Sequence, residues 1–230
     1  MGQNENPQKS TDSSKPDTPR AKSVEKLWAA RGVEDVYFQG EAQVTWWTIL
    51  GGIAVGAVLT RLESISGALR TGQWYVILYL LATLLVIINS WVQTTWGSLV
   101  LHWPISIPTS VLIFFQGIAM SVAGLNIFTP ALWYTAISVV VITAVSNQLA
   151  FSRTHAWENL PEELVRRAKT GIHIYCFIGV YTIASSILLA LVDNRTLEMI
   201  WGIVALLVSI LALVWQHIGM MEEKRMMGIP

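Results

Sequence analysis

The chain has 230 residues, of which 53% are hydrophobic and only 13% are charged, against roughly 25% charged residues in an ordinary soluble domain. Its formal net charge is zero, which argues against nucleic acid as a partner. The single cysteine, Cys176, excludes an intrachain disulfide and a metal site built from several cysteines. We therefore expect a polytopic membrane protein that is embedded in a lipid bilayer.

The N-terminal region is polar and carries much of the charge. Residues 1–41 hold thirteen of the thirty charged side chains and contain no apolar stretch of the kind found in secretory signal peptides. Residues 1–22 are rich in Ser, Thr, Pro, Asn and Gln and are predicted to be a disordered tail. Residues 23–44 are expected to form an interfacial helix and linker, with Ser23 as its N-cap and Trp28 as its membrane anchor.

Six apolar segments of about 16 to 25 residues follow, close to the ~20 residues that an α-helix needs to cross a bilayer. The predicted spans cover about residues 45–60, 74–96, 109–128, 130–151, 171–192 and 197–220. Arg61 and Glu63 interrupt the first span, which can also run on to Leu69. Two prolines in "HWPISIPTS" precede the third span and leave a re-entrant segment open. The predicted fold is an all-α, six-transmembrane-helix bundle over residues 45–220.

Lysine and arginine counts favour one orientation of the bundle. With six spans and a cytoplasmic N-terminus, the inner segments carry twelve of these residues and the outer segments three. A re-entrant third span would change that division to seven and eight. Because cytoplasmic loops are enriched in Lys and Arg, both termini, including residues 221–230, are predicted to be cytoplasmic. The compact chain without a signal fits a bacterial inner or plasma membrane.

The loop 152–170 has the sequence pattern of an amphipathic helix. Asn159 and Glu162 form a capping box in "ENLPEELVRRAKTG". One interpretation is a helix that lies on the cytoplasmic membrane surface before the fifth span. The alternative is a docking surface for another protein subunit, and the residues that would form it are Leu160, Leu164, Arg166 and Arg167.

Polar residues within the spans are almost all uncharged. The cores of spans two to five contain no Asp, Glu, Lys or Arg, and the sixth contains only Glu198 near its start. Proton-coupled pumps and voltage sensors depend on ionisable residues at such depth, so both classes are disfavoured. The neutral side chains of Asn89, Gln93, Gln116 and Asn147 either form hydrogen bonds between helices or line an uncharged pore.

Small residues recur at a spacing that allows helices to approach closely. Gly52 and Gly56 follow the GxxxG pattern in the first span, and Gly117 and Ser121 repeat it in the third. These residues predict helix packing either within the subunit or between copies of the chain.

The histidines suggest a cofactor hypothesis. His173 and His217 are predicted at a similar depth on the fifth and sixth spans, where two facing imidazoles could ligate a haem. The competing interpretations are that the histidines hold another metal ion, or that both are interfacial histidines with no cofactor. The chain has no HExxH, no GxSxG and no phosphate-binding glycine loop, and we expect no enzymatic activity.

Three functions remain open from the sequence. The first is a non-catalytic membrane subunit, anchor or sensor that contacts other membrane or cytoplasmic proteins or copies of itself. The second is a homo-oligomeric channel or facilitator with an uncharged polar pore. The third is a haem-bearing electron-transfer subunit.

Overall fold

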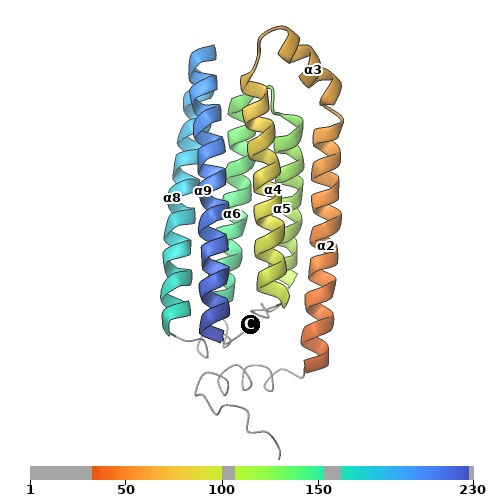
Figure 1. The fold of residues 1–230 in the computed structure, drawn as a ribbon, viewed down its shortest axis with the longest axis vertical. Coiled ribbons are helices and arrows are strands. Elements are labelled where there is room, and N and C mark those ends of the chain that lie inside the picture. Colours follow the sequence, from red (N-terminus) through yellow and green to blue (C-terminus); the bar gives the residue numbers. More distant parts are fainter. Residues whose placement is uncertain (1–32, 100–106, 153–161, 228–230) are drawn as a thin grey trace, which may run out of the picture.

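The computed structural model describes residues 33–99, 107–152 and 162–227, and these residues form helices and short turns (Figure 1). The helices are α2 (Val33–Leu59), α3 (Leu62–Arg70), α4 (Tyr75–Leu99), α5 (Ile107–Leu125), α6 (Pro130–Ser152), α8 (Glu162–Leu191) and α9 (Arg195–Met227). Six segments of this part of the chain are long and apolar enough to cross a membrane. The predicted all-α class with six candidate spans is confirmed, while the predicted tail, residues 1–22, lies outside the described residues.

The six long helices form two layers of three. In one layer α4 packs between α2 and α9, and in the other α6 packs between α5 and α8. The layers are joined closely where α2 packs on α5, and much more sparsely where α8 meets α9. We call the end of the bundle that carries α3 the upper end, and the end at which α9 finishes the lower end, as drawn in Figure 1.

The first predicted span ends in a turn rather than running on to Leu69. Helix α2 stops at Leu59, and α3 begins at Leu62 and leans across the upper end (Figure 1). Helix α3 is amphipathic and buries Ile65 and Ala68, which explains why it lies over the bundle instead of continuing α2. Gly72 follows α3 with φ of 80°, a left-handed conformation that favours glycine.

The predicted loop helix and the fifth span are one continuous helix. Helix α8 runs for 30 residues from Glu162 to Leu191 and passes through Gly171 without a break. The amphipathic helix predicted within the loop 152–170 is therefore, from Glu162 on, the first part of α8, while residues 153–161 lie outside the described residues. The helix continues because the residues before Gly171, Arg166 to Lys169, favour helix, and because the apolar residues after it contain no proline up to Leu191 and must pair their backbone groups within the segment in a bilayer. Helix α5 is also unbroken from Ile107 to Leu125, whereas residues 126–128, the end of the third predicted span, form a turn.

Two close contacts hold the layers together at the α2–α5 edge. A Cβ added at Gly117 would lie 2.9 Å from Leu50, and one added at Gly124 would lie 2.9 Å from Val58. These two glycines of α5 let its backbone approach α2 more closely than any side chain would allow. The α2–α5 edge is therefore the tightly packed edge of the bundle.

Candidate functional site

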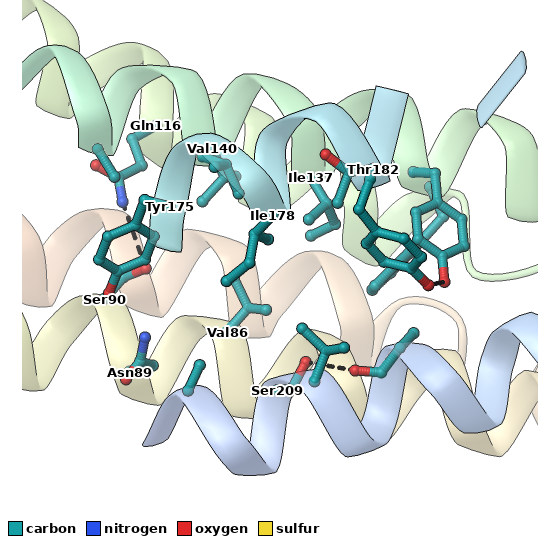
Figure 2. Close-up of a pocket in the computed structure, with 18 of the residues that line it drawn as sticks. Val86, Asn89, Ser90, Gln116, Ile137, Val140, Tyr175, Ile178, Thr182 and Ser209 are labelled. Carbon is teal, nitrogen blue, oxygen red and sulfur yellow. Dashed lines mark hydrogen bonds between the residues drawn. The ribbon is translucent and has the colours of Figure 1, made fainter. Parts of the chain in front are cut away.

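A cavity of about 70 Å³ lies between the two layers at the centre of the bundle (Figure 2). Such a volume holds several water-sized molecules. Its walls come from α4, α5, α6, α8 and α9, and none of the residues that line it is Asp, Glu, Lys or Arg. The site is therefore an uncharged chamber lined by five of the six long helices.

One end of the cavity is polar. We call Asn89, Ser90, Gln93, Gln116 and Tyr175 the polar layer, and all five line the cavity. The Gln116 side-chain amide donates to the Ser90 hydroxyl over 3.4 Å, and the Tyr175 hydroxyl donates to Gln93 Oε1 over 3.4 Å. Both distances are longer than a typical hydrogen bond. Figure 2 shows Asn89, Ser90, Gln116 and Tyr175 gathered at this end.

A further amide extends the polar layer toward the lower end. With its side-chain nitrogen turned toward α4, Gln216 of α9 donates to the Asn89 side-chain oxygen. The remainder of the cavity wall is mainly apolar and includes Val86, Ile137, Val140 and Ile178 (Figure 2). The chamber thus has a hydrogen-bonding end and an apolar body.

The aromatic cluster, Tyr79, Trp133, Tyr134 and Tyr181, closes the cavity toward the upper end. Its rings meet edge to face, with centroids 5.1 Å apart for Tyr79 and Trp133 and 5.9 Å apart for Tyr134 and Tyr181. The Tyr134 hydroxyl donates to the Trp201 carbonyl over 2.8 Å and lies 2.8 Å from the Tyr181 hydroxyl. These contacts link α4, α6, α8 and α9 above the chamber.

The Arg167 cluster links helices at the lower end. The Arg167 guanidinium of α8 pairs with Glu222 and Glu223 of α9 and lies over the Trp215 ring, 5.6 Å from its centroid. Glu223 also accepts a hydrogen bond of 2.6 Å from the Trp96 indole of α4. Only 17% of the Arg167 and Glu223 side chains is exposed. The cluster therefore ties α4, α8 and α9 together below the polar layer.

Three of the four predicted pore residues meet at the cavity. Asn89, Gln93 and Gln116 line it, although they come from two helices. Asn147 is not among the lining residues, and its buried side-chain oxygen has no hydrogen-bond partner within the described part of the chain. The neighbouring side-chain oxygen of Gln148 is in the same situation.

The predicted partner-binding residues are divided between the inside and the outside of the bundle. Leu164 is buried at 5% exposure, and Arg167 belongs to the Arg167 cluster. Arg166 is exposed, and Leu160 lies outside the described residues. Two of the four side chains are thus used in contacts within the subunit.

The predicted helix-packing residues also separate into two groups. Gly117 packs against Leu50, and Ser121 donates a hydrogen bond to the Gly117 carbonyl over 3.0 Å. A Cβ added at Gly52 or Gly56 would meet nothing within 4 Å. The GxxxG face of α2 is therefore open.

The structure does not bring the predicted haem ligands into the cavity. His173 and His217 are both exposed, and neither is a lining residue. A ring nitrogen of His173 lies 2.7 Å from the backbone oxygen of Lys169 on its own helix. Within the described ranges, no group of three or more His, Cys, Asp or Glu side chains is arranged to hold a metal ion.

Some cavity residues were missed from the sequence. Ser90 and Ser209 are buried and line the cavity, and the half-buried Gln216 contacts the lining residue Asn89, whereas its neighbour His217 is exposed. Successive residues on a helix point about 100° apart, so Gln216 and His217 cannot both face inward. The available signal was position: Gln216 on the sixth span is predicted at the depth of the amides on the second.

A second hollow of about 300 Å³ lies between α2 and α5 near the lower end. Trp46 and Phe114 line it and are about half exposed. Its one amide, Gln43, accepts a hydrogen bond of 2.7 Å from Ser98. Because most of its lining residues are apolar, namely Ala42, Trp46, Leu50, Ile113 and Phe114, this hollow suits a lipid chain better than a polar ligand.

Comparisons with known proteins place no further constraint on the site, since no family model, curated protein or solved structure matches the chain.

Proposed function

We propose that the protein is a membrane facilitator that takes small uncharged molecules into the cavity between its two helix layers. The observation that carries this proposal is the convergence of Asn89, Gln93 and Gln116 on one chamber whose lining has no charge. Neutral amides offer both donors and acceptors, whereas an ion in the chamber would lose its hydration without a counter-charge.

The geometry of the polar layer supports binding rather than packing alone. The two hydrogen bonds of 3.4 Å that hold Gln116 and Tyr175 are long, and a guest molecule that offers a shorter bond replaces them at small cost. In such a facilitator, the aromatic cluster at the upper end and the Arg167 cluster at the lower end would hold the closed state. In the predicted orientation, the Arg167 cluster lies on the cytoplasmic side.

The test is solute permeability of liposomes that contain the purified protein. Swelling rates are measured for water, glycerol, acetamide and butyramide in protein-containing and empty vesicles. Asn89→Leu and Gln93→Leu each remove one polar contact, worth about 1 kcal/mol, and are expected to lower the protein-dependent permeability roughly fivefold to tenfold. Thr135→Val, which changes a polar side chain outside the cavity, is expected to leave it unchanged. A protein-dependent permeability of zero for all four solutes contradicts the proposal.

A second candidate is a membrane subunit or anchor that contacts other proteins or copies of itself. It is supported by the open face at Gly52 and Gly56 on α2, where another helix can approach closely. Gly52→Ile and Gly56→Ile are expected to dissociate such an assembly, while Gly67→Ile, at an open glycine of α3, leaves it intact. Native mass spectrometry of gently extracted protein measures the assembly, and a single chain in every sample contradicts this candidate.

A further inference from the structure

The cavity lies directly behind the seam between α8 and α9. These two helices stand side by side (Figure 1), but α8 packs mainly on α6 and α9 mainly on α4, and they meet each other sparsely. Both supply wall residues, namely Tyr175 and Ile178 from α8 and Val208, Ser209 and Ala212 from α9. Parting this seam would open the chamber to the bilayer.

Polar contacts across the seam lie near its ends in the described part of the chain. At the lower end the Arg167 guanidinium of α8 pairs with the carboxylates of α9. At the upper end the Tyr134 hydroxyl joins Tyr181 of α8 to the Trp201 carbonyl of α9. Between these ends, the Ser209 hydroxyl is satisfied by the Ala205 carbonyl of its own helix.

Opening the middle of the seam therefore breaks few polar contacts. Its apolar side chains exchange contacts with each other for contacts with lipid tails, which are about as apolar as leucine. Opening the lower end instead separates the ion pairs of the Arg167 cluster. Opening the upper end breaks hydrogen bonds of 2.8 Å and the edge-to-face contacts of the aromatic cluster. The middle of the seam is therefore easier to open than either of its ends.

We infer that the substrate of the cavity reaches it from the bilayer, between α8 and α9, and that it is a small lipid-soluble molecule with one uncharged hydrogen-bonding group. This inference rests on the proposed function, because it names the substrate class and the route for the same chamber. The polar layer binds the hydrogen-bonding group, and Val86, Ile137, Val140 and Ile178 surround an apolar body. Short-chain amides and alcohols have this chemistry.

The route is tested by thiol labelling at a single cysteine inside the chamber. The native Cys176 is exposed on α8, and Cys176→Ala provides a cysteine-free background. Ser209→Cys then places a thiol of nearly the same size in the cavity wall. Ser185→Cys is the matched control, since Ser185 is buried at 2% exposure on α8 and does not line the cavity. The protein with native Cys176 calibrates the reactivity of a thiol on the exposed surface of α8.

Membrane vesicles are treated with N-phenylmaleimide, which is uncharged and lipid-soluble, or with a trimethylammonium methanethiosulfonate, which is charged and does not cross the bilayer. We expect N-phenylmaleimide to label Ser209→Cys at least about tenfold faster than Ser185→Cys, because labelling follows thiol exposure. We expect the charged reagent, applied from either side, to label both variants at the same low rate. Ser90→Cys, at the polar end of the cavity, repeats the test at a second position.

Two outcomes overturn the inference. Fast labelling of Ser209→Cys by the charged reagent shows that the chamber opens to water, which leaves the facilitator proposal standing without its lateral route. No labelling of Ser209→Cys and Ser90→Cys while Cys176 reacts shows that the seam stays closed. The liposome permeability assay on the same proteins separates the two proposals: the expected labelling without protein-dependent permeability supports lateral access but contradicts the facilitator.

Discussion

The upper and lower halves of the bundle use their polar side chains differently. In the upper half, the Trp133 indole donates to Thr83 over 2.8 Å, Thr83 donates to the Tyr79 carbonyl over 2.7 Å, and the Tyr79 hydroxyl donates to the Glu198 carbonyl over 3.0 Å. These three side chains are at most 2% exposed. Their polar atoms are paired with one another in a closely packed interior.

In the lower half, the hydrogen bonds between side chains of the polar layer are longer. The polar layer has hydrogen bonds of 3.4 Å beside a cavity. Four buried polar atoms of the lower half have no partner in the described ranges, namely Trp47 Nε1, Thr95 Oγ1, Asn147 Oδ1 and Gln148 Oε1, against two in the upper half, Arg61 Nε and Trp201 Nε1. Buried polar groups are normally satisfied. The aromatic half is thus held by short hydrogen bonds, whereas the long hydrogen bonds of the polar layer beside the cavity fit the proposed binding of a guest molecule there.

The largest effect is expected in the aromatic half. Trp133→Ala removes a side chain that is 2% exposed and leaves a void beside Tyr79 and Tyr134, which costs about 3–5 kcal/mol of the free energy of unfolding. The measurement is a titration with sodium dodecyl sulfate from mild detergent. The matched control is Trp74→Ala at the same end, where 64% of the side chain is exposed, and no change is expected. Equal losses for the two variants would mean that the cluster does not stabilise the bundle.

A smaller loss is expected where the two layers join. Gly117→Ala forces a methyl group to within 2.9 Å of Leu50, and overpacking of this kind costs about 1–3 kcal/mol. Gly52→Ala is the matched change on open space and is expected to leave the unfolding midpoint unchanged. The same detergent titration compares them. If Gly52→Ala lost as much stability as Gly117→Ala, the contacts of α2 would differ from those described above.

The sequence predicted the helices well because the length of an apolar segment is a local property. Six spans follow from runs of apolar residues without knowledge of their neighbours. The arrangement in two layers could not be predicted in the same way. In a bilayer, the lipid-facing and buried sides of a helix are both apolar, so the sequence gives little indication of which side faces inward. Trp47 and Trp46 are neighbours, yet one is 1% and the other 59% exposed.

The sequence predicted some of the polar residues of the candidate site, but neither all of them nor the cavity that they line. Asn89, Gln93 and Gln116 were recognised because amides are uncommon in membrane spans, and a pore-lining role was one of their two interpretations. Gln216 was missed because its partner Asn89 is far away in sequence. The cavity itself depends on side-chain sizes from five helices, and no local pattern carries that information. The role of Arg167 was also hidden, since its carboxylate partners lie on another helix.

The Arg167 cluster offers a test at the lower end. Arg167→Gln removes the charge that pairs with Glu222 and Glu223, and Glu223→Gln removes one of its partners. A double-mutant cycle from the detergent titration is expected to give a coupling free energy of about 1–2 kcal/mol, as for partly buried residues that share a network. Arg166→Gln, on the exposed neighbour, serves as the control and is expected to show no coupling to Glu223→Gln. A coupling of zero for Arg167 would mean that the lower closure does not depend on this ion pair.

The smallest effect on stability is expected in the polar layer itself. Gln93→Leu removes the side-chain oxygen that accepts a hydrogen bond of 3.4 Å from the Tyr175 hydroxyl. Hydrogen bonds between membrane helices contribute only about 0.6 kcal/mol on average. The detergent titration should therefore show a shift much smaller than that of Trp133→Ala, although Gln93→Leu is expected to impair permeability. A substitution that changes activity without changing stability is the expected behaviour of a binding residue. If Gln93→Leu instead destabilised the protein as much as Trp133→Ala, Gln93 would be a structural residue like Trp133. The proposal that the polar layer binds a guest molecule would then be contradicted.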